Sequence, residues 1–116
     1  LSVNGGESWR NWYIDSALVS PVCEASLLHV KSEDESYTLF SGPNDELERK
    51  NLSLWLGDES GQNWREPQTV YANAAAYSDM TETQTGTIAL VYESDEYHRI
   101  VFECIEWSKW LDLVPE

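Results

Sequence analysis

Short stretches in which apolar and polar residues alternate recur along this chain, and turn-forming residues separate them. In "NLSLWLG", at 51–57, a leucine stands at every second position from Leu52 to Leu56. A period of two residues indicates a β-strand with one buried face. Bounded by Gly, Pro, Asn, Asp or Ser, such stretches are typical of antiparallel sheets. The pattern predicts strands at 24–30, 37–41, 51–57, 68–71, 76–80, 87–93 and 99–107.

The helical period of 3.6 residues is not found in any long segment of the sequence. The segment "WSKWLDL", at 107–113, predicts at most one helical turn near the end. The chain is therefore expected to be nearly all antiparallel β-sheet.

Two eight-residue segments, "SVNGGESW" at 2–9 and "GDESGQNW" at 57–64, resemble each other. Each predicts a tight turn, in which a glycine supplies backbone freedom and a polar side chain accepts hydrogen bonds from the turn. The tryptophan is expected to fold back between sheets, so the role of the turn is structural. The matched positions are Asn4 and Glu59, Gly6 and Gly61, and Trp9 and Trp64.

The strands repeat along with these turns. "SYTLFSGP" returns as "TGTIALVYE", and "NLSLWLG" returns as "RIVFECIEW". A period of about 50 residues with four short strands in each unit is typical of β-propeller blades. The residues 24–71 predict one complete blade, with the closing strand of another before it and three strands of a third after it. Because so few blades cannot close a ring, residues 1–116 are expected to be the C-terminal portion of a larger propeller.

Composition excludes two classes of partner. The net charge is −14, and only 7 residues are Lys or Arg, so few nucleic-acid phosphates could be neutralised. No apolar run approaches the roughly 18 residues of a membrane span. Two cysteines, Cys23 and Cys104, fit neither a disulfide framework nor a zinc site, and the sequence leaves their pairing open.

Four stretches, in order, resemble the C-terminal part of exo-α-sialidases (neuraminidases), which are six-bladed propellers with repeated Asp boxes. They are "SPVCEASLL", "FSGPNDELERKNLSLWLGDESGQNW", "AAYSDM" and "GTIALVYE", and they cover nearly the whole chain. The resemblance implies an all-β fold that is part of a six-bladed β-propeller. It also implies that 2–9 and 57–64 are Asp boxes, with Asn4 and Glu59 where the family usually has aspartate.

The resemblance implies that Tyr77 is the nucleophile of a retaining exo-α-sialidase. Sialic acid carries a carboxylate on its anomeric carbon, which would repel a carboxylate nucleophile. A phenol, with an ordinary pKa near ~10, is neutral and avoids this repulsion, although it needs a nearby base for activation. The small residues Ala74, Ala75 and Ala76 would leave room for the substrate. The alternative is an ordinary tyrosine that begins a strand.

Two further residues match the family pattern. Arg49 fits the third of three arginines that grip the substrate carboxylate, since a guanidinium forms two parallel hydrogen bonds with a carboxylate. The alternative is a surface arginine paired with Glu46 or Glu48. Glu93 matches a glutamate that orients another arginine of that triad, and its alternative is an ordinary surface residue.

Other catalytic residues of the family belong to a more N-terminal region than these residues cover: the acid/base aspartate, the base glutamate and two of the arginines. Asp79 is therefore expected to have no catalytic role. His29 and His98 have no metal-ligand spacing near them, so neither a metal nor a cofactor is expected.

The leading hypothesis is retaining hydrolysis of terminal sialic acid from glycoproteins, glycolipids or oligosaccharides. One alternative is a trans-sialidase, and another is a non-catalytic Asp-box propeller that binds glycan or protein. Only an enzyme needs to keep Tyr77, Arg49 and Glu93 together. Because the charge of −14 repels an anionic substrate on average, capture would need a local arginine cluster. A lysosomal or secreted setting is favoured, and the remainder of the propeller is an expected partner.

Overall fold

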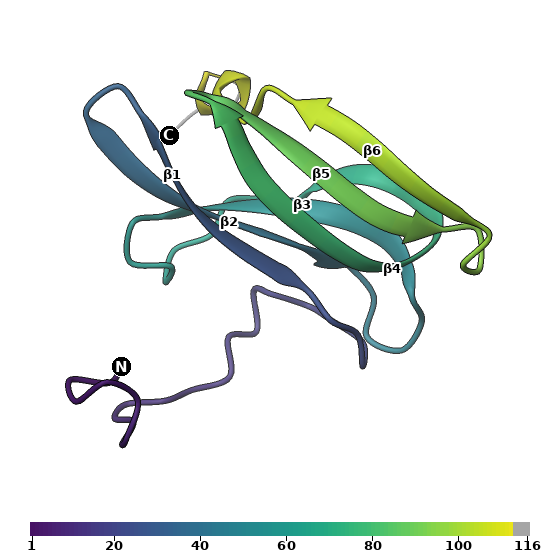
Figure 1. The fold of residues 1–116 in the computed structure, drawn as a ribbon. Helices are drawn as coiled ribbons and strands as arrows, with labels where there is room; N and C mark the ends of the chain where they lie inside the picture. Colours follow the sequence, from purple (N-terminus) through teal and green to yellow (C-terminus); the bar gives the residue numbers. More distant parts are fainter. Residues whose placement is uncertain (113–116) are drawn as a thin grey trace.

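The structure, a computed structural model, describes residues 1–112. These residues form a six-stranded antiparallel sheet in which the strands follow chain order, and a short 3₁₀ helix follows it (Figure 1). The elements are β1 (Ser26–Ser32), β2 (Glu35–Pro43), β3 (Lys50–Asp58), β4 (Gln68–Gln84), β5 (Thr87–Ser94), β6 (Arg99–Ile105) and η1 (Trp107–Leu111). The predicted all-β fold is confirmed, and η1 is the helical turn predicted at 107–113, of which residue 113 lies outside the described residues.

Strand β4 is one continuous strand of 17 residues, although 68–71 and 76–80 were expected to be separate strands. Ala74 is the last residue of β4 that pairs with β3, and Ala75 is the first that pairs with β5. The alanine-rich middle of β4 lacks alternation and has low strand propensity. Pairing with a different neighbour on each side of this point keeps the middle extended nevertheless.

The two halves of the sheet fold onto each other at β4 and enclose one hydrophobic core. A hydrogen bond of 2.7 Å between the hydroxyls of Ser41 in β2 and Ser78 in β4 joins the halves. Removing the apolar side chains of both halves from water is the main stabilising contribution to this arrangement. The buried cluster consists of Val30, Leu39, Leu52, Leu54, Leu56, Ala75, Met80, Ile88, Leu90, Tyr92 and Trp107.

The closing strand expected before residue 24 is not formed, and this prediction was wrong. Residues 1–25 contain turns and bends but no strand, and Figure 1 shows this purple segment running apart from the sheet. A strand requires backbone partners on a neighbouring strand, and no described strand pairs with residues 1–25: β1 pairs with β2, and its other edge stays open. Side-chain contacts from the sheet tie the segment down: the indole Nε1 of Trp64 donates to Asp15 at 3.0 Å, and the Arg49 guanidinium donates to the Val22 carbonyl.

The turn at 57–64 is closed by Asp58 rather than by the expected Glu59. The Asp58 carboxylate accepts hydrogen bonds from the Ser60 hydroxyl at 2.5 Å and from the Gln62 N–H at 3.3 Å. The hydrogen bond from Ser60 first, then one from the Asn63 side chain, and more weakly that from Gln62, lower the pKa of Asp58 to about 2. Trp64 folds back onto the strand and forms an isolated bridge with Gly57. The position needs glycine, because a Cβ there would lie 2.7 Å from the indole.

The turn at 2–9 has similar hydrogen bonds but different surroundings. The Asn4 side-chain oxygen accepts from the Ser8 N–H at 3.0 Å, and Gly6 has a positive φ of 93°. The Gly61 of the other turn also has a positive φ, of 68°. Trp9, however, is 66% exposed and does not pack between sheets as expected. The turn lies in the N-terminal segment, which runs apart from the sheet.

Candidate functional site

Tyr77 lies inside β4, at a β-bulge, and does not begin a strand. Between Ala75 and Ser78 the pairing with β5 shifts register. Two residues of β4, Ala76 and Tyr77, therefore lie opposite one residue of β5, Glu93. Bulges bend a strand and redirect a side chain, and they are common beside active sites. Tyr77 is 48% exposed although the residues on both sides of it are buried.

The Glu93 carboxylate holds this bulge. A bulge leaves a backbone group without its partner in the ladder, and an unpaired N–H is costly. Here Oε1 of Glu93 accepts a hydrogen bond from the Tyr77 N–H at 3.2 Å. Glu93 therefore fixes the backbone at the candidate nucleophile. Its expected contact with another arginine involves a residue outside this chain and stays a prediction.

Arg49 reaches Tyr77 from the end of a different strand. It immediately precedes β3, and its carbonyl accepts a hydrogen bond of 3.0 Å from the Ala75 N–H, so the backbone of Arg49 is fixed at the middle of β4. Its guanidinium carbon lies 5.4 Å from the centroid of the Tyr77 ring. This separation is within the roughly 6 Å of a cation–π contact. The structure thus brings together Tyr77, Arg49 and Glu93.

Further contacts hold the guanidinium of Arg49. Nε and Nη2 donate to the carbonyl oxygen of Val22 at 3.1 and 2.8 Å, and Nη1 donates to the hydroxyl of Tyr97 at 2.9 Å. The hydrogen bond to Tyr97 raises the pKa of Arg49 above its ordinary value, against the opposing effect of burial. Both partners are neutral, so the positive charge of Arg49 is not cancelled.

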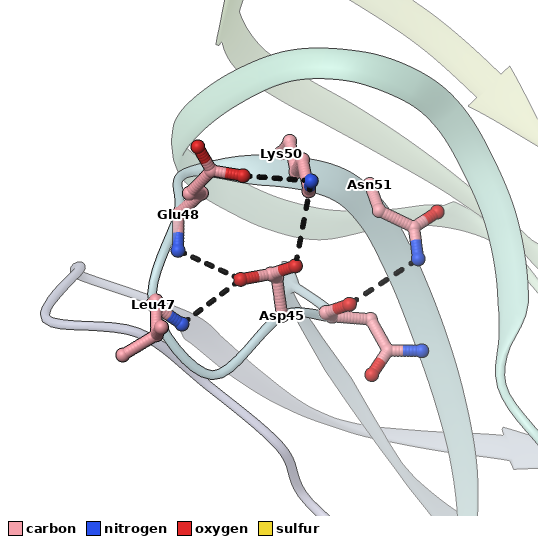
Figure 2. A network of polar contacts seen from close by, with 6 residues as sticks. Asp45, Leu47, Glu48, Lys50 and Asn51 are labelled. Carbon is pink, nitrogen blue, oxygen red and sulfur yellow. Dashed lines mark hydrogen bonds and ion pairs between the residues drawn. The ribbon is translucent and has the colours of Figure 1, made fainter.

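The loop before Arg49 is ordered by its own polar contacts, which Figure 2 shows. The Asp45 carboxylate accepts from the N–H groups of Leu47 and Glu48 at 2.9 and 2.7 Å, and these two hydrogen bonds lower the pKa of Asp45. Glu48 pairs with Lys50 at 2.7 Å. Glu48 therefore takes Lys50 as its partner, which is not the pairing with Arg49 considered from the sequence.

A depression of about 570 Å³ opens beside Arg49. Its wall includes Ala74, Ala75 and Ala76, the small residues expected to leave room, together with Arg49 and Glu93. Tyr77 lines a smaller hollow of about 150 Å³, which Glu93 also lines. Glu93 thus lies at the border between the two spaces.

The remaining sequence candidates lie outside this group. The Asp79 carboxylate accepts from the Ser26 hydroxyl at 2.9 Å, a contact between the two halves of the sheet. Cys23 and Cys104 are both free thiols, and burial raises the pKa of Cys23, although the charge of Arg49 opposes the shift.

Within residues 1–112 there is no helix long and apolar enough to cross a membrane.

Three features of the site were missed from the sequence: the bulge, the Val22 carbonyl and Tyr97. The loss of alternation at 72–76 was the available indication of the bulge. A main-chain carbonyl has no sequence pattern. Tyr97 lies in a turn with a positive φ of 71°, a conformation that bulky residues rarely adopt.

Comparison with known proteins finds similarity to sialidases in sequence and in fold. The sialidase of Vibrio cholerae is 28% identical over 105 residues, which are 82% of this chain and 13% of that protein. The sialidase of Bacteroides fragilis is 28% identical over 109 residues, which are 87% of this chain and 20% of that protein. The chain thus spans a small part of the relatives that it matches. No protein-family model matches the chain.

A solved structure, titled Hadza microbial sialidase Hz136, superposes on this chain with a TM-score of 0.69 and 25% sequence identity. The match covers 78% of this chain and 18% of that one. The sialidase resemblance seen in the sequence is confirmed, and the open all-β sheet is consistent with part of a sialidase β-propeller.

Proposed function

We propose that this chain supplies part of the active site of a retaining exo-α-sialidase, with Tyr77 as the nucleophile and Arg49 as a ligand of the substrate carboxylate. The observation that carries the proposal is the guanidinium of Arg49 placed 5.4 Å from the Tyr77 ring, beside a depression walled by alanines. The confirmed resemblance to sialidases supports it. A cation, an exposed phenol and open space are what this chemistry requires.

The reaction has two steps. The Tyr77 oxygen attacks the anomeric carbon while the bond from that carbon to the leaving oxygen breaks. The phenolic proton passes to a base, and the leaving oxygen takes a proton from an acid. By the resemblance, both groups belong to another part of the longer protein to which this chain is proposed to belong, called the parent protein below. Water then attacks the same carbon while it gives a proton to the former acid; the bond to the tyrosine oxygen breaks, and that oxygen regains its proton from the base, so the configuration is retained.

Arg49 would act on both steps through its charge. Its guanidinium would bind the carboxylate next to the anomeric carbon, and it favours the negative charge that develops on the phenol oxygen. A local cation matters here because the chain has a net charge of −14, which repels an anionic glycan on average. Terminal sialic acids of glycoproteins, glycolipids and oligosaccharides are the proposed substrates.

Kinetics of the full-length parent protein test this proposal. Sialyl-glycoside turnover followed by NMR should release the α-anomer of sialic acid first. Arg49→Ala should raise KM about 10- to 100-fold, since a hydrogen bond to a charged group contributes about 1.5–3 kcal/mol. The exposed Arg10 offers a matched control, and Arg10→Ala should leave KM within about twofold.

Each contrary outcome has its own meaning. First release of the β-anomer would contradict a tyrosyl intermediate. Transfer to a sugar acceptor in preference to water would identify a trans-sialidase. Binding of sialosides without turnover would favour the non-catalytic propeller.

A further inference from the structure

The hydroxyl of Tyr97 accepts a hydrogen bond of 2.9 Å from Nη1 of Arg49, across 48 residues of sequence. We propose that Tyr97 is a positioning residue, which holds the Arg49 guanidinium in the orientation that receives the substrate carboxylate. This inference rests on the proposed function and adds to it a residue that the sequence comparison did not single out. Tyr97 is 60% exposed and lines the same depression as Arg49, so core packing does not explain its place.

The turn that carries Tyr97 has an unusual backbone. Asp95, Glu96 and Tyr97 have successive positive φ values of 51°, 57° and 71°. Residues with a side chain rarely adopt this region, and a run of them persists only where the surroundings enforce it. The conformation therefore requires an explanation beyond a plain hairpin connection.

The surroundings of Asp95 supply that constraint. Its N–H donates to the Ala74 carbonyl at 2.9 Å, which ties the turn to the middle of β4. Its carboxylate accepts a hydrogen bond from the Tyr71 hydroxyl and pairs with Arg99 at 3.4 Å. The β5–β6 turn is thus anchored at the point where Arg49 also contacts β4.

The donors of Arg49 are divided in a way that suits this role. A guanidinium has five N–H donors, and three of them contact Val22 and Tyr97. Two donors remain, which is the number that one bidentate carboxylate requires. Val22 holds the guanidinium on one side and Tyr97 adds a second point of support. Because a phenol is neutral, it orients the guanidinium without competing for it as a carboxylate would.

The test measures binding to the full-length parent protein. The probe is 2-deoxy-2,3-didehydro sialic acid, which carries the carboxylate, and calorimetry gives its Kd. Tyr97→Phe removes only the hydroxyl and should raise Kd and KM about 5- to 20-fold, with kcat within about threefold. Tyr13 is 58% exposed, which makes Tyr13→Phe a matched control that should leave all three values unchanged.

A double-mutant cycle separates positioning from a general structural effect. In an Arg49→Ala background, Tyr97→Phe should change Kd by less than about twofold. An unchanged Kd for Tyr97→Phe alone, or an equal loss with and without Arg49, would overturn the proposal. If Tyr97→Phe does not fold, Tyr97→Gln and Tyr97→Leu give the same comparison, because only glutamine keeps an acceptor oxygen.

The failure of this inference differs from the failure of the proposed function. If the folded parent protein does not bind the probe at all, the sialidase proposal fails, and the role of Tyr97 fails with it. If the parent binds and turns over sialosides while Tyr97→Phe matches it, only the role of Tyr97 is excluded.

Discussion

At the scale of single residues, three side chains from different strands or their ends meet because backbone contacts bring their positions together. Ala75 donates to the Arg49 carbonyl, and the bulge turns Tyr77 outward opposite Glu93. The partners of the Arg49 guanidinium are neutral groups. The site therefore keeps a cation beside an exposed phenol, which an ion pair with a neighbouring glutamate would have weakened.

Glu93 provides a prediction at this scale. Glu93→Ala removes the acceptor of the Tyr77 N–H, which should cost about 0.5–1.5 kcal/mol in the free energy of unfolding and speed hydrogen exchange at the Tyr77 amide. Glu93→Gln keeps an acceptor oxygen and should preserve slow exchange. Exchange mass spectrometry of the peptide that contains Tyr77 measures both. Equal exchange in the wild-type protein and in Glu93→Ala would contradict a role for Glu93 in holding the bulge.

At the scale of elements, alternation predicted most of the fold, and tertiary pairing decided the rest. The strand with Leu52, Leu54 and Leu56 forms as its alternation predicts, but both of its faces are buried, because Ser53 and Trp55 on the other face are buried as well. Strand β4 does not follow a predicted pattern, since the residues around Ala74 have no alternation. They gain their strand conformation by pairing with two different neighbouring strands. The bulge at Tyr77 is a one-residue register shift in the pairing with β5, and the loss of alternation at 72–76 indicates it without fixing its position.

The residues of the candidate site could be predicted only where the resemblance to sialidases implies a role for them. Tyr77, Arg49 and Glu93 were found because they match sialidase segments. Tyr97 was not found in the sequence, because its position depends on three successive residues with positive φ. Contacts from residues distant in the sequence enforce this backbone conformation. In the turn at 57–64 the matched spacing indicated Glu59, while local geometry placed the neighbouring Asp58 toward the N–H groups.

The identity of the carboxylate that accepts the hydrogen bonds in the turn at 57–64 can be tested by the pH dependence of stability. The pKa of Asp58 is lowered from 3.8 to about 2, so its ionised form stabilises the folded state above pH 3.8, and this contribution is lost as the pH falls from 3.8 to about 2. Asp58→Asn should lower the melting temperature above that range, and its difference from the wild-type protein should shrink within it. Thermal unfolding of the parent protein between about pH 2 and about pH 6 measures this difference in melting temperature. The upper limit lies well above the ordinary pKa values of carboxyl groups. Glu59→Gln is the control; if it, and not Asp58→Asn, produced this pattern, Glu59 would be the acceptor after all.

At the scale of the whole molecule, the sheet has two open edges, β1 and β6. Exposed apolar side chains lie along β6, where Ile100 is 73% exposed and Phe102 is 64% exposed. Such a surface is typical of a contact that another part of a protein covers. The chain spans only a small part of the length of its sialidase relatives, which agrees with a covered β6 surface. We propose that the remainder of a propeller covers it.

The same reasoning predicts that residues 1–116 alone do not turn over sialosides. The proposed nucleophile and one arginine lie in this chain, whereas the acid and the base are expected elsewhere in the parent protein. A fluorogenic sialoside assay of the purified segment beside the full-length protein measures this. Turnover by the segment alone would show that its own residues supply both proton transfers.

The central claim is that Tyr77 is the nucleophile, and trapping of the covalent intermediate tests it most directly. The full-length parent protein is incubated with a 2,3-difluoro sialic acid, which slows the second step so that the glycosyl-enzyme accumulates. Intact mass and peptide mapping then locate the adduct. The account predicts one adduct on the peptide that contains Tyr77, lost in Tyr77→Phe. An adduct on any other residue, or turnover that survives in Tyr77→Phe, would contradict it.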